Sequence, residues 1–285
     1  QDLVKTESIQ KLIDAGTETL YVHAANRLKF VNHVTVGLVE RLKNPTMTED
    51  EQVSAADEAL QAVQEEALKG PTPAPLSVQE LTSAAVQACL DIAHKNPSVA
   101  GLLKKLMANK SSFLYKHTQL IVVITQHIIS KSEWGTNEQK LKLAFVAFFH
   151  DICLTVDRYA KYRSDLSVGL DTDLSILEKE LIAKHAKLSA EIIQKFPTAP
   201  IGADIIIMQH HGTSNGHGFA KTFTNSVSPL AIVFIVAEEL AHLILQYPEG
   251  TDIATKHDEM IDRLNATYTR SKFQKVIETL NTLTF

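Results

Sequence analysis

The second half of the chain repeats apolar positions three and four residues apart, which predicts a succession of helices. We expect two helices near the end of the chain and, before them, helices over residues 111–130, 137–156, 174–196, 199–211 and 226–246. Gly135, Pro197 and Gly212 separate these segments, as is typical of helix ends. Segment 159–173 is polar and lacks the periodicity, so we expect a loop there. This half of the chain is predicted to be all-α.

The first third of the chain has a mixed pattern. Residues 19–23 and 28–31 are short apolar runs that predict two strands, with 24–27 as the turn between them. The Pro-rich segment 71–75 is expected to be a stiff connector. Helices are predicted over residues 8–15, 34–42, 47–69, 77–95 and 97–107. We therefore expect a small α or α+β N-terminal domain over 1–106, followed by a helical bundle over 107–285.

Composition narrows the class of protein. With 285 residues and 45% hydrophobic content, the chain can bury a sizeable core. The net charge of -5, without a dense cluster of Lys and Arg, argues against a duplex nucleic-acid partner. We find no apolar segment of roughly 18 residues and no signal-peptide pattern, so we expect no membrane span and a cytoplasmic location. Cys89 and Cys153 lie in apolar helical contexts and are expected to be reduced.

The pair His150-Asp151 directly follows the apolar run 143–149. A carboxylate at the end of a buried helix is costly unless a cation or a hydrogen-bond donor meets it. A second pair, His257-Asp258, lies in a polar stretch and is expected at the surface. The first pair is therefore the better candidate for a functional site.

Other histidines flank this pair at separations of about 25 to 35 residues. His117 and His185 lie on predicted helices, where a lone histidine is more often a hydrogen-bonded core residue. His210-His211 is more informative, because both side chains can reach one site only where their helix ends, and Gly212 provides that end. His127 is predicted to face away from His117.

An acidic pair completes the set of candidates. Glu238-Glu239 interrupts the apolar run 230–237, so one of them faces the core or a cleft unless both lie at a solvated helix edge. Imidazole and carboxylate ligands together favour Fe, Mn or Zn over Mg or Ca. More ligands than one ion needs suggests two metals, which would clamp a phosphoryl group and hold a hydroxide for attack on phosphorus.

The order His, His-Asp, His, His-His, acid resembles that of the HD superfamily of metal-dependent phosphohydrolases, and most closely the HD-GYP subfamily, whose members hydrolyse cyclic di-GMP. The resemblance covers roughly residues 110–285, and the late Val-Ala-Asp motif of the subfamily selects Glu238 over Glu239. The preceding segment, 1–106, resembles the small regulatory or sensory domain that often precedes such modules. It implies two divalent ions, iron or manganese, with His150 and Asp151 at the catalytic centre. The implied metal ligands are His117, His150, Asp151, His185, His210, His211 and Glu238.

Several positions depart from the subfamily pattern. Leu154 replaces a lysine, Gly212 replaces the Glu of His-His-Glu, and Phe219-Ala220 replaces the Tyr-Pro of Gly-Tyr-Pro. Phe113 stands where members with a third metal carry Glu, so a two-metal site is expected. Candidates to replace the lost cation are Arg158, Lys161 and Arg163.

The sequence leaves three functional hypotheses. The first is a phosphodiesterase that opens cyclic di-GMP to pGpG or GMP. The second is a weak or inactive relative that binds metal together with a nucleotide or a signalling protein partner, as a receptor. The third is a helical scaffold whose histidines are ordinary core residues.

Overall fold

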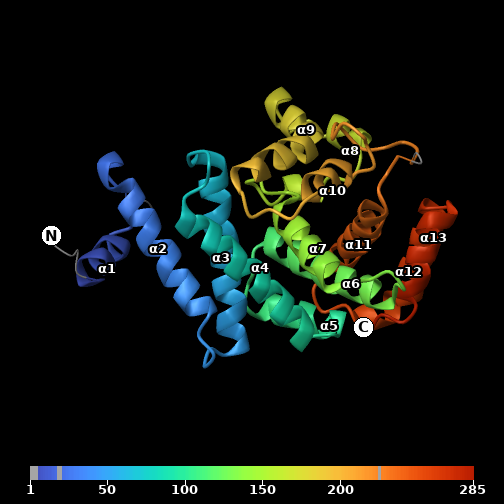
Figure 1. Ribbon diagram of the computed structural model, residues 1–285, viewed down its shortest axis with the longest axis horizontal. Helices are drawn as coiled ribbons and strands as arrows, with labels where there is room; N and C mark the ends of the chain where they lie inside the picture. The colour runs from blue at the N-terminus through green and yellow to red at the C-terminus, as the bar shows by residue number, and fades with distance from the viewer. Residues whose placement is uncertain (1–5, 18–20, 224–225) are drawn as a thin grey trace.

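The computed structural model describes residues 6–17, 21–223 and 226–285, and regular structure in these ranges is helical throughout (Figure 1). The helices of the first part are α1 (Thr6–Asp14), α2 (Arg27–Leu42), α3 (Glu49–Lys69), α4 (Leu76–Lys95) and α5 (Val99–Ala108). Those of the second part are α6 (Phe113–Lys131), α7 (Asn137–Phe149), α8 (Asp165–Leu170), α9 (Ile176–Ile192), α10 (Ala203–Gln209), α11 (Pro229–Gln246), α12 (His257–Thr267) and α13 (Ser271–Leu280). The predicted mainly-α fold class is confirmed.

The helices pack as one elongated array. Helix α4 packs against α2 and α3 on one side and against α6 and α7 on the other. Helix α6 also packs against α11 and α13, and α10 packs against α7, α9 and α11. The buried apolar side chains of these helices form a continuous core from Val31 to Leu283. The division of the chain at residue 106 stays a prediction.

Helix α11 lies deep in this core. Ser228 caps its N-terminus by accepting a hydrogen bond from the backbone N–H of Ala231, and Pro229 occupies the first turn, where its missing N–H costs nothing. In the described residues α11 alone is long and apolar enough to cross a membrane, with 18 residues of which 72% are buried inside the fold. The expectation that no segment reaches this length is corrected, although burial of this kind is typical of a core helix.

The predicted N-terminal hairpin is wrong. Residues 28–31 lie within α2, the intended turn contributes a short 3-10 helix (Ala24–Asn26), and residues 21–23 have no regular structure. Residues 19 and 20, which the first strand would include, lie outside the described residues. Val31, Thr35 and Leu38 are the buried positions of α2, and their spacing of three and four residues is helical. A short apolar run was therefore mistaken for a strand.

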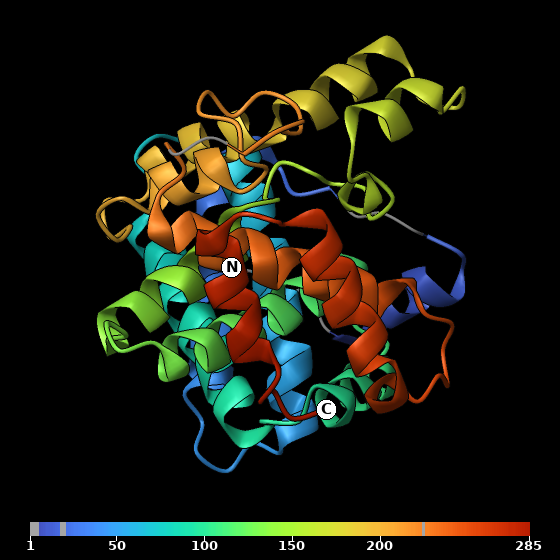
Figure 2. The same cartoon turned by 90° about the vertical axis from the view of Figure 1, so that its right-hand side faces the viewer.

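Two segments near the candidate site also differ from expectation. Helix α7 ends at Phe149 instead of continuing to residue 156, and a turn closed by the Leu154 N–H bonding to the Asp151 carbonyl follows. Segment 159–173 contains a 3-10 turn and α8 rather than a continuous loop. Figure 2 shows α8 and the start of α9 projecting beyond the main body of the molecule.

Candidate metal centre

The seven residues singled out from the sequence lie together in the interior. His117 is on α6, His150 and Asp151 follow α7, and His185 is on α9. His210 and His211 follow α10, and Glu238 is on α11. All are buried except His211, whose side chain is 12% exposed. Five separate segments thus deliver imidazole and carboxylate groups to one region of the core.

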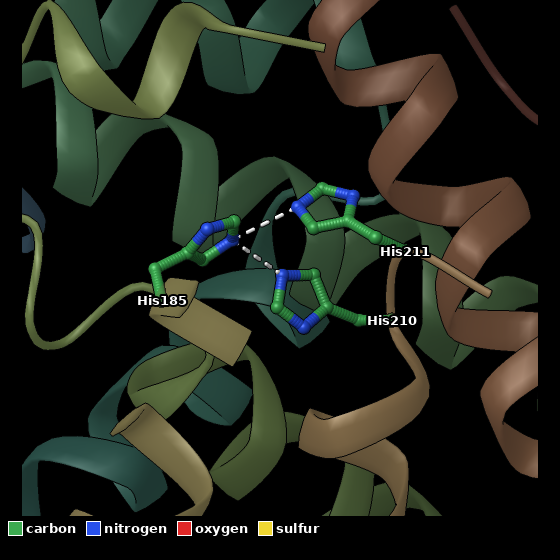
Figure 3. A group of neighbouring side chains, drawn as sticks. All are labelled: His185, His210 and His211. Carbon is green, nitrogen blue, oxygen red and sulfur yellow. Dashed lines mark hydrogen bonds between the residues drawn. The ribbon is translucent and has the colours of Figure 1, made fainter. Parts of the chain in front are cut away.

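His185, His210 and His211 form the first cluster (Figure 3). The Nε2 atom of His185 lies 3.0 Å from Nε2 of His210 and 2.9 Å from Nε2 of His211. The Nδ1 atoms of His185 and His210 lie 2.6 Å from the carbonyl oxygens of Ile182 and Ile207, each three residues earlier on the same helix. A carbonyl can only accept, so both Nδ1 atoms carry the proton.

This arrangement fixes the tautomer of two imidazoles. Burial lowers the pKa of His185, and it lowers the pKa of His210 well below its ordinary value, so both rings are neutral at pH 7. With the proton on Nδ1, the facing Nε2 atoms of His185 and His210 both present lone pairs and no proton lies between them. Two lone pairs 3.0 Å apart repel, whereas a cation shared by both nitrogens is attracted to each. The cluster therefore fits a divalent metal ion.

Asp151 connects this cluster to a second one. One carboxylate oxygen, Oδ1, lies 3.3 Å from Nε2 of His185 and 4.0 Å from Nε2 of His210. The other, Oδ2, lies 3.3 Å from Nε2 of His150. His150 is oriented like the first two histidines, with Nδ1 2.8 Å from the carbonyl oxygen of Ala147. The two oxygens of one buried carboxylate thus face two different groups of histidine nitrogens.

The second cluster comprises two overlapping groups. The ligand atoms of His117, His150 and Asp151 lie within 4.8 Å of one another, as do those of His117, Glu238 and His242. Both nitrogens of His117 and Oε2 of Glu238 are buried without a hydrogen-bond partner. Such unsatisfied polar atoms are rare in folded proteins and need an explanation such as an ion. The donor set again fits a divalent metal.

His242 is the residue that the sequence reasoning missed. It lies four residues after Glu238 on α11, so both side chains point from the same face of the helix. Its Nε2 atom is 3.8 Å from Oε1 of Glu238, and its ring centroid is 4.3 Å from that of His117. The spacing of four residues from Glu238 was a signal that could have identified it.

Burial and mutual proximity determine the charges in the site. Burial disfavours the ionised forms of Asp151 and His150, but their attraction outweighs this effect. The pKa of Asp151 is held well below its ordinary value and the pKa of His150 is raised to about 9. Burial raises the pKa of Glu238 to about 8. A cation beside Glu238 would restore its carboxylate form, because an adjacent positive charge favours the ionised state.

A cavity of about 440 Å³ opens beside these clusters, a volume within the range of about 300–1,000 Å³ usual for small-molecule sites. His210, His211, Glu238 and His242 contribute to its wall. The remaining wall combines cationic and aromatic side chains, among them Arg163, Lys221, Arg270, Phe219, Phe223, Tyr268 and Phe273.

Of the three cations proposed to replace the missing lysine, Arg163 is the one that lines this cavity. It pairs with Glu239, and its Nε atom is buried without a hydrogen-bond partner. Arg158 instead pairs with Glu178, and Lys161 lies over the ring of Phe113. Glu238 therefore faces the histidines, while its neighbour Glu239 faces the cavity and Arg163.

The positions that depart from the subfamily pattern lie among apolar or aromatic side chains. Leu154 is 3% exposed and packs in a small apolar cluster with Tyr159 and Ile182, so it presents no polar group to the cavity. Gly212 has φ +76°, and a Cβ atom there would lie 2.4 Å from the ring of Phe223. Phe219 places its ring centroid 4.3 Å from that of His211. Apolar and small residues therefore occupy places where the subfamily has polar ones.

Comparison with known proteins identifies the fold. No protein-family model matches the sequence, and no curated protein matches it either. Among solved structures, the chain is similar to Bd1817, described as an HDG"Y"P protein from Bdellovibrio bacteriovorus. The sequence identity is 19% and the TM-score is 0.53, over 98% of this chain and 87% of that chain. The fold expected from the sequence motifs, that of a divergent HD-GYP-like protein, is thereby confirmed.

Proposed function

We propose that this protein is a metal-dependent phosphohydrolase that cleaves a phosphodiester bond of a cyclic dinucleotide, with cyclic di-GMP as the substrate to test first. The observation that carries the proposal is the position of Asp151, whose two carboxylate oxygens face two groups of buried imidazole nitrogens. A shared carboxylate between two sets of nitrogen donors is the donor arrangement of a two-metal site. The likeness in fold to an HDG"Y"P protein supports the same class of chemistry.

The proposed ligands divide into two sets that share Asp151. His185, His210 and His211 would hold one divalent ion, and His117, His150 and Glu238 would hold the other. Mixed nitrogen and carboxylate donors favour iron, with manganese as the alternative. When bound, such a pair of ions neutralises charge on a phosphoryl group and lowers the pKa of water.

The residues of the chain would then bind and orient the nucleotide. Arg163, Lys221 and Arg270 lie in the wall of the cavity and can donate hydrogen bonds to phosphate oxygens. Phe223 is partly exposed and packs against the buried rings of Tyr268 and Phe273, with ring centroids 4.9 to 5.2 Å apart, so a base can stack on the open side of Phe223. Cationic and aromatic groups beside a carboxylate-histidine cluster match a nucleotide phosphodiester better than a small inorganic anion.

A receptor that binds without turnover is the second candidate, and the surroundings of Leu154 and Gly212 favour it. Leu154 is buried in apolar surroundings, so it cannot supply the cation that the subfamily places at this position. At Gly212 the left-handed backbone and the nearby Phe223 ring exclude the glutamate of the subfamily pattern. The proposed metal ligands are thus present, while two polar groups that the subfamily pattern places around them are absent.

Incubation of metal-loaded protein with cyclic di-GMP, followed by chromatography, distinguishes the two functions. Formation of pGpG or GMP supports the phosphodiesterase. Binding by calorimetry without product supports the receptor, and absence of both binding and product contradicts the cyclic dinucleotide as ligand.

The two His-Asp pairs provide matched variants for this assay. His150→Ala should abolish turnover and lower the metal content. His257 is 19% exposed and contacts Phe285, outside the proposed ligand set, so His257→Ala should leave both unchanged. Equal effects of the two substitutions would argue against a role specific to His150.

A further inference from the structure

We propose that His242 is a fifth protein ligand of the ion held by His117, His150, Asp151 and Glu238, which leaves the two metal positions chemically unequal. This inference rests on the proposed two-metal site and adds a ligand that the subfamily motifs do not include. His242 is 6% exposed on the inward face of α11, one helical turn after Glu238.

The position of the His242 ring is suited to a ligand. The Nε2 atom faces Oε1 of Glu238 at 3.8 Å, too far for a hydrogen bond and consistent with two donors arranged around one ion. The His242 ring also lies against His117, with centroids 4.3 Å apart. The ligand atoms of all three residues fall within 4.8 Å of one another. A core histidine that served only packing would have no reason to meet both a carboxylate and a second imidazole.

The two overlapping groups around His117 describe one ion position. A neutral imidazole has a single lone pair, so His117 can bind only one ion. The group with His150 and Asp151 and the group with Glu238 and His242 would then share that ion through His117. Its protein ligands would number five, namely His117, His150, Asp151, Glu238 and His242.

The second ion has fewer protein ligands. His185, His210, His211 and the shared Asp151 give it four. If both ions take six ligands, as octahedral iron and manganese do, the first keeps one position for a non-protein ligand and the second keeps two. Residues of both sets lie in the cavity wall, namely His211 of the second and Glu238 and His242 of the first, so the larger number of open positions would be what favours the second ion for the phosphate of a substrate. The first ion, with five protein ligands, would be bound more tightly and would have less room for the substrate.

The experiment is a manganese titration of metal-free protein, with unbound Mn²⁺ counted by electron paramagnetic resonance. Wild-type protein should bind two ions, the first more tightly than the second. His242→Gln, which removes the imidazole with little loss of volume, should weaken the tighter ion at least about tenfold, since even partners that only support a ligand change affinity by about 10–100-fold. The weaker ion should keep its affinity.

Two controls separate this inference from the proposed function. His33→Ala changes an exposed histidine on α2 and should titrate like wild type. Equal thermal melting of metal-free His242→Gln and metal-free wild type would show that the fold is retained. Two ions bound with wild-type affinities in a folded His242→Gln would overturn the assignment of His242, whereas failure of wild-type protein to bind Mn²⁺ or Fe²⁺ would overturn the two-metal proposal itself.

Discussion

Replacing Asp151 with Asn tests the shared carboxylate, because it keeps the shape of the side chain and removes the charge. Asp151 is 4% exposed, and its two oxygens each lie 3.3 Å from a histidine nitrogen of a different cluster. An amide retains one carbonyl oxygen and turns an NH₂ group toward the other cluster, where a donor repels a cation. The substitution should therefore weaken both ions, unlike a change of any one histidine.

The size of the effect follows from the number of ions affected. Loss of a supporting partner costs about 10–100-fold in metal affinity, so loss of a direct anionic ligand should cost at least about 100-fold for each ion. A factor of about 100 corresponds to about 2.8 kcal/mol, and two ions give about 5.6 kcal/mol. Because bound metal stabilises the folded state by the same free energy, metal-loaded Asp151→Asn should melt about 11–22 °C below metal-loaded wild type.

The assay is metal content by elemental analysis after gel filtration, together with thermal melting before and after addition of Mn²⁺. Asp258→Asn is the control, since that carboxylate belongs to the other His-Asp pair and its side chain is 99% exposed. It should behave like wild type. Asp151→Asn with wild-type metal content and an unchanged melting temperature would refute the idea that this carboxylate serves two ions.

Three further predictions concern the cavity, the backbone and pH. Arg163→Ala should weaken cyclic di-GMP binding by about 10–150-fold in calorimetry, which corresponds to the loss of one charged hydrogen bond, and should leave the metal content unchanged. Arg158 lies outside the cavity, so Arg158→Ala should leave cyclic di-GMP binding unchanged. Gly212→Ala should lower stability by about 2–4 kcal/mol in urea unfolding, because φ is +76° and the Cβ atom would clash, whereas Gly37→Ala in open space on α2 should raise it. Metal-free protein should be most stable near pH 6.5, measured as the urea midpoint from pH 5 to 9. Below that pH the unfolded chain binds more protons than the folded protein, so stability falls as the pH is lowered. Above it the folded protein binds more protons than the unfolded chain, so stability falls as the pH is raised. The first effect comes from the lowered pKa of His117, His185, His210, His211 and His242, and the second from the raised pKa of His150 and Glu238.

The sequence was sufficient for the mainly helical fold class and for the neighbours of His150, although not for the start of the chain. A histidine and a carboxylate directly after a wholly apolar run are costly to bury without a cation or a hydrogen-bond partner, so the sequence alone indicated a functional site at this pair. His210-His211 was informative for a similar reason, since Gly212 ends the helix and lets both rings turn to one side. Both features depend only on neighbouring residues in the chain, so a single sequence is enough to recognise them.

Other features needed the three-dimensional arrangement. The short apolar run from Leu28 to Val31 is compatible with either a strand or a helix. The packing of α2 against α3 and α4 favours the helix. The direction of Arg163, toward the cavity rather than toward solvent, depends on Glu239 of a distant helix. His242 was overlooked because a histidine within an apolar helix suggests a core residue until His117 is seen beside it.

The most direct test of the account is the metal content of the wild-type protein, purified without added metal and reconstituted with Fe²⁺ or Mn²⁺ under anaerobic conditions. Elemental analysis should find about two ions per chain, since the clusters of His185 and of His117 share Asp151. A content near zero after reconstitution, in protein that retains its helical circular dichroism, would contradict the account and leave the histidines as core residues.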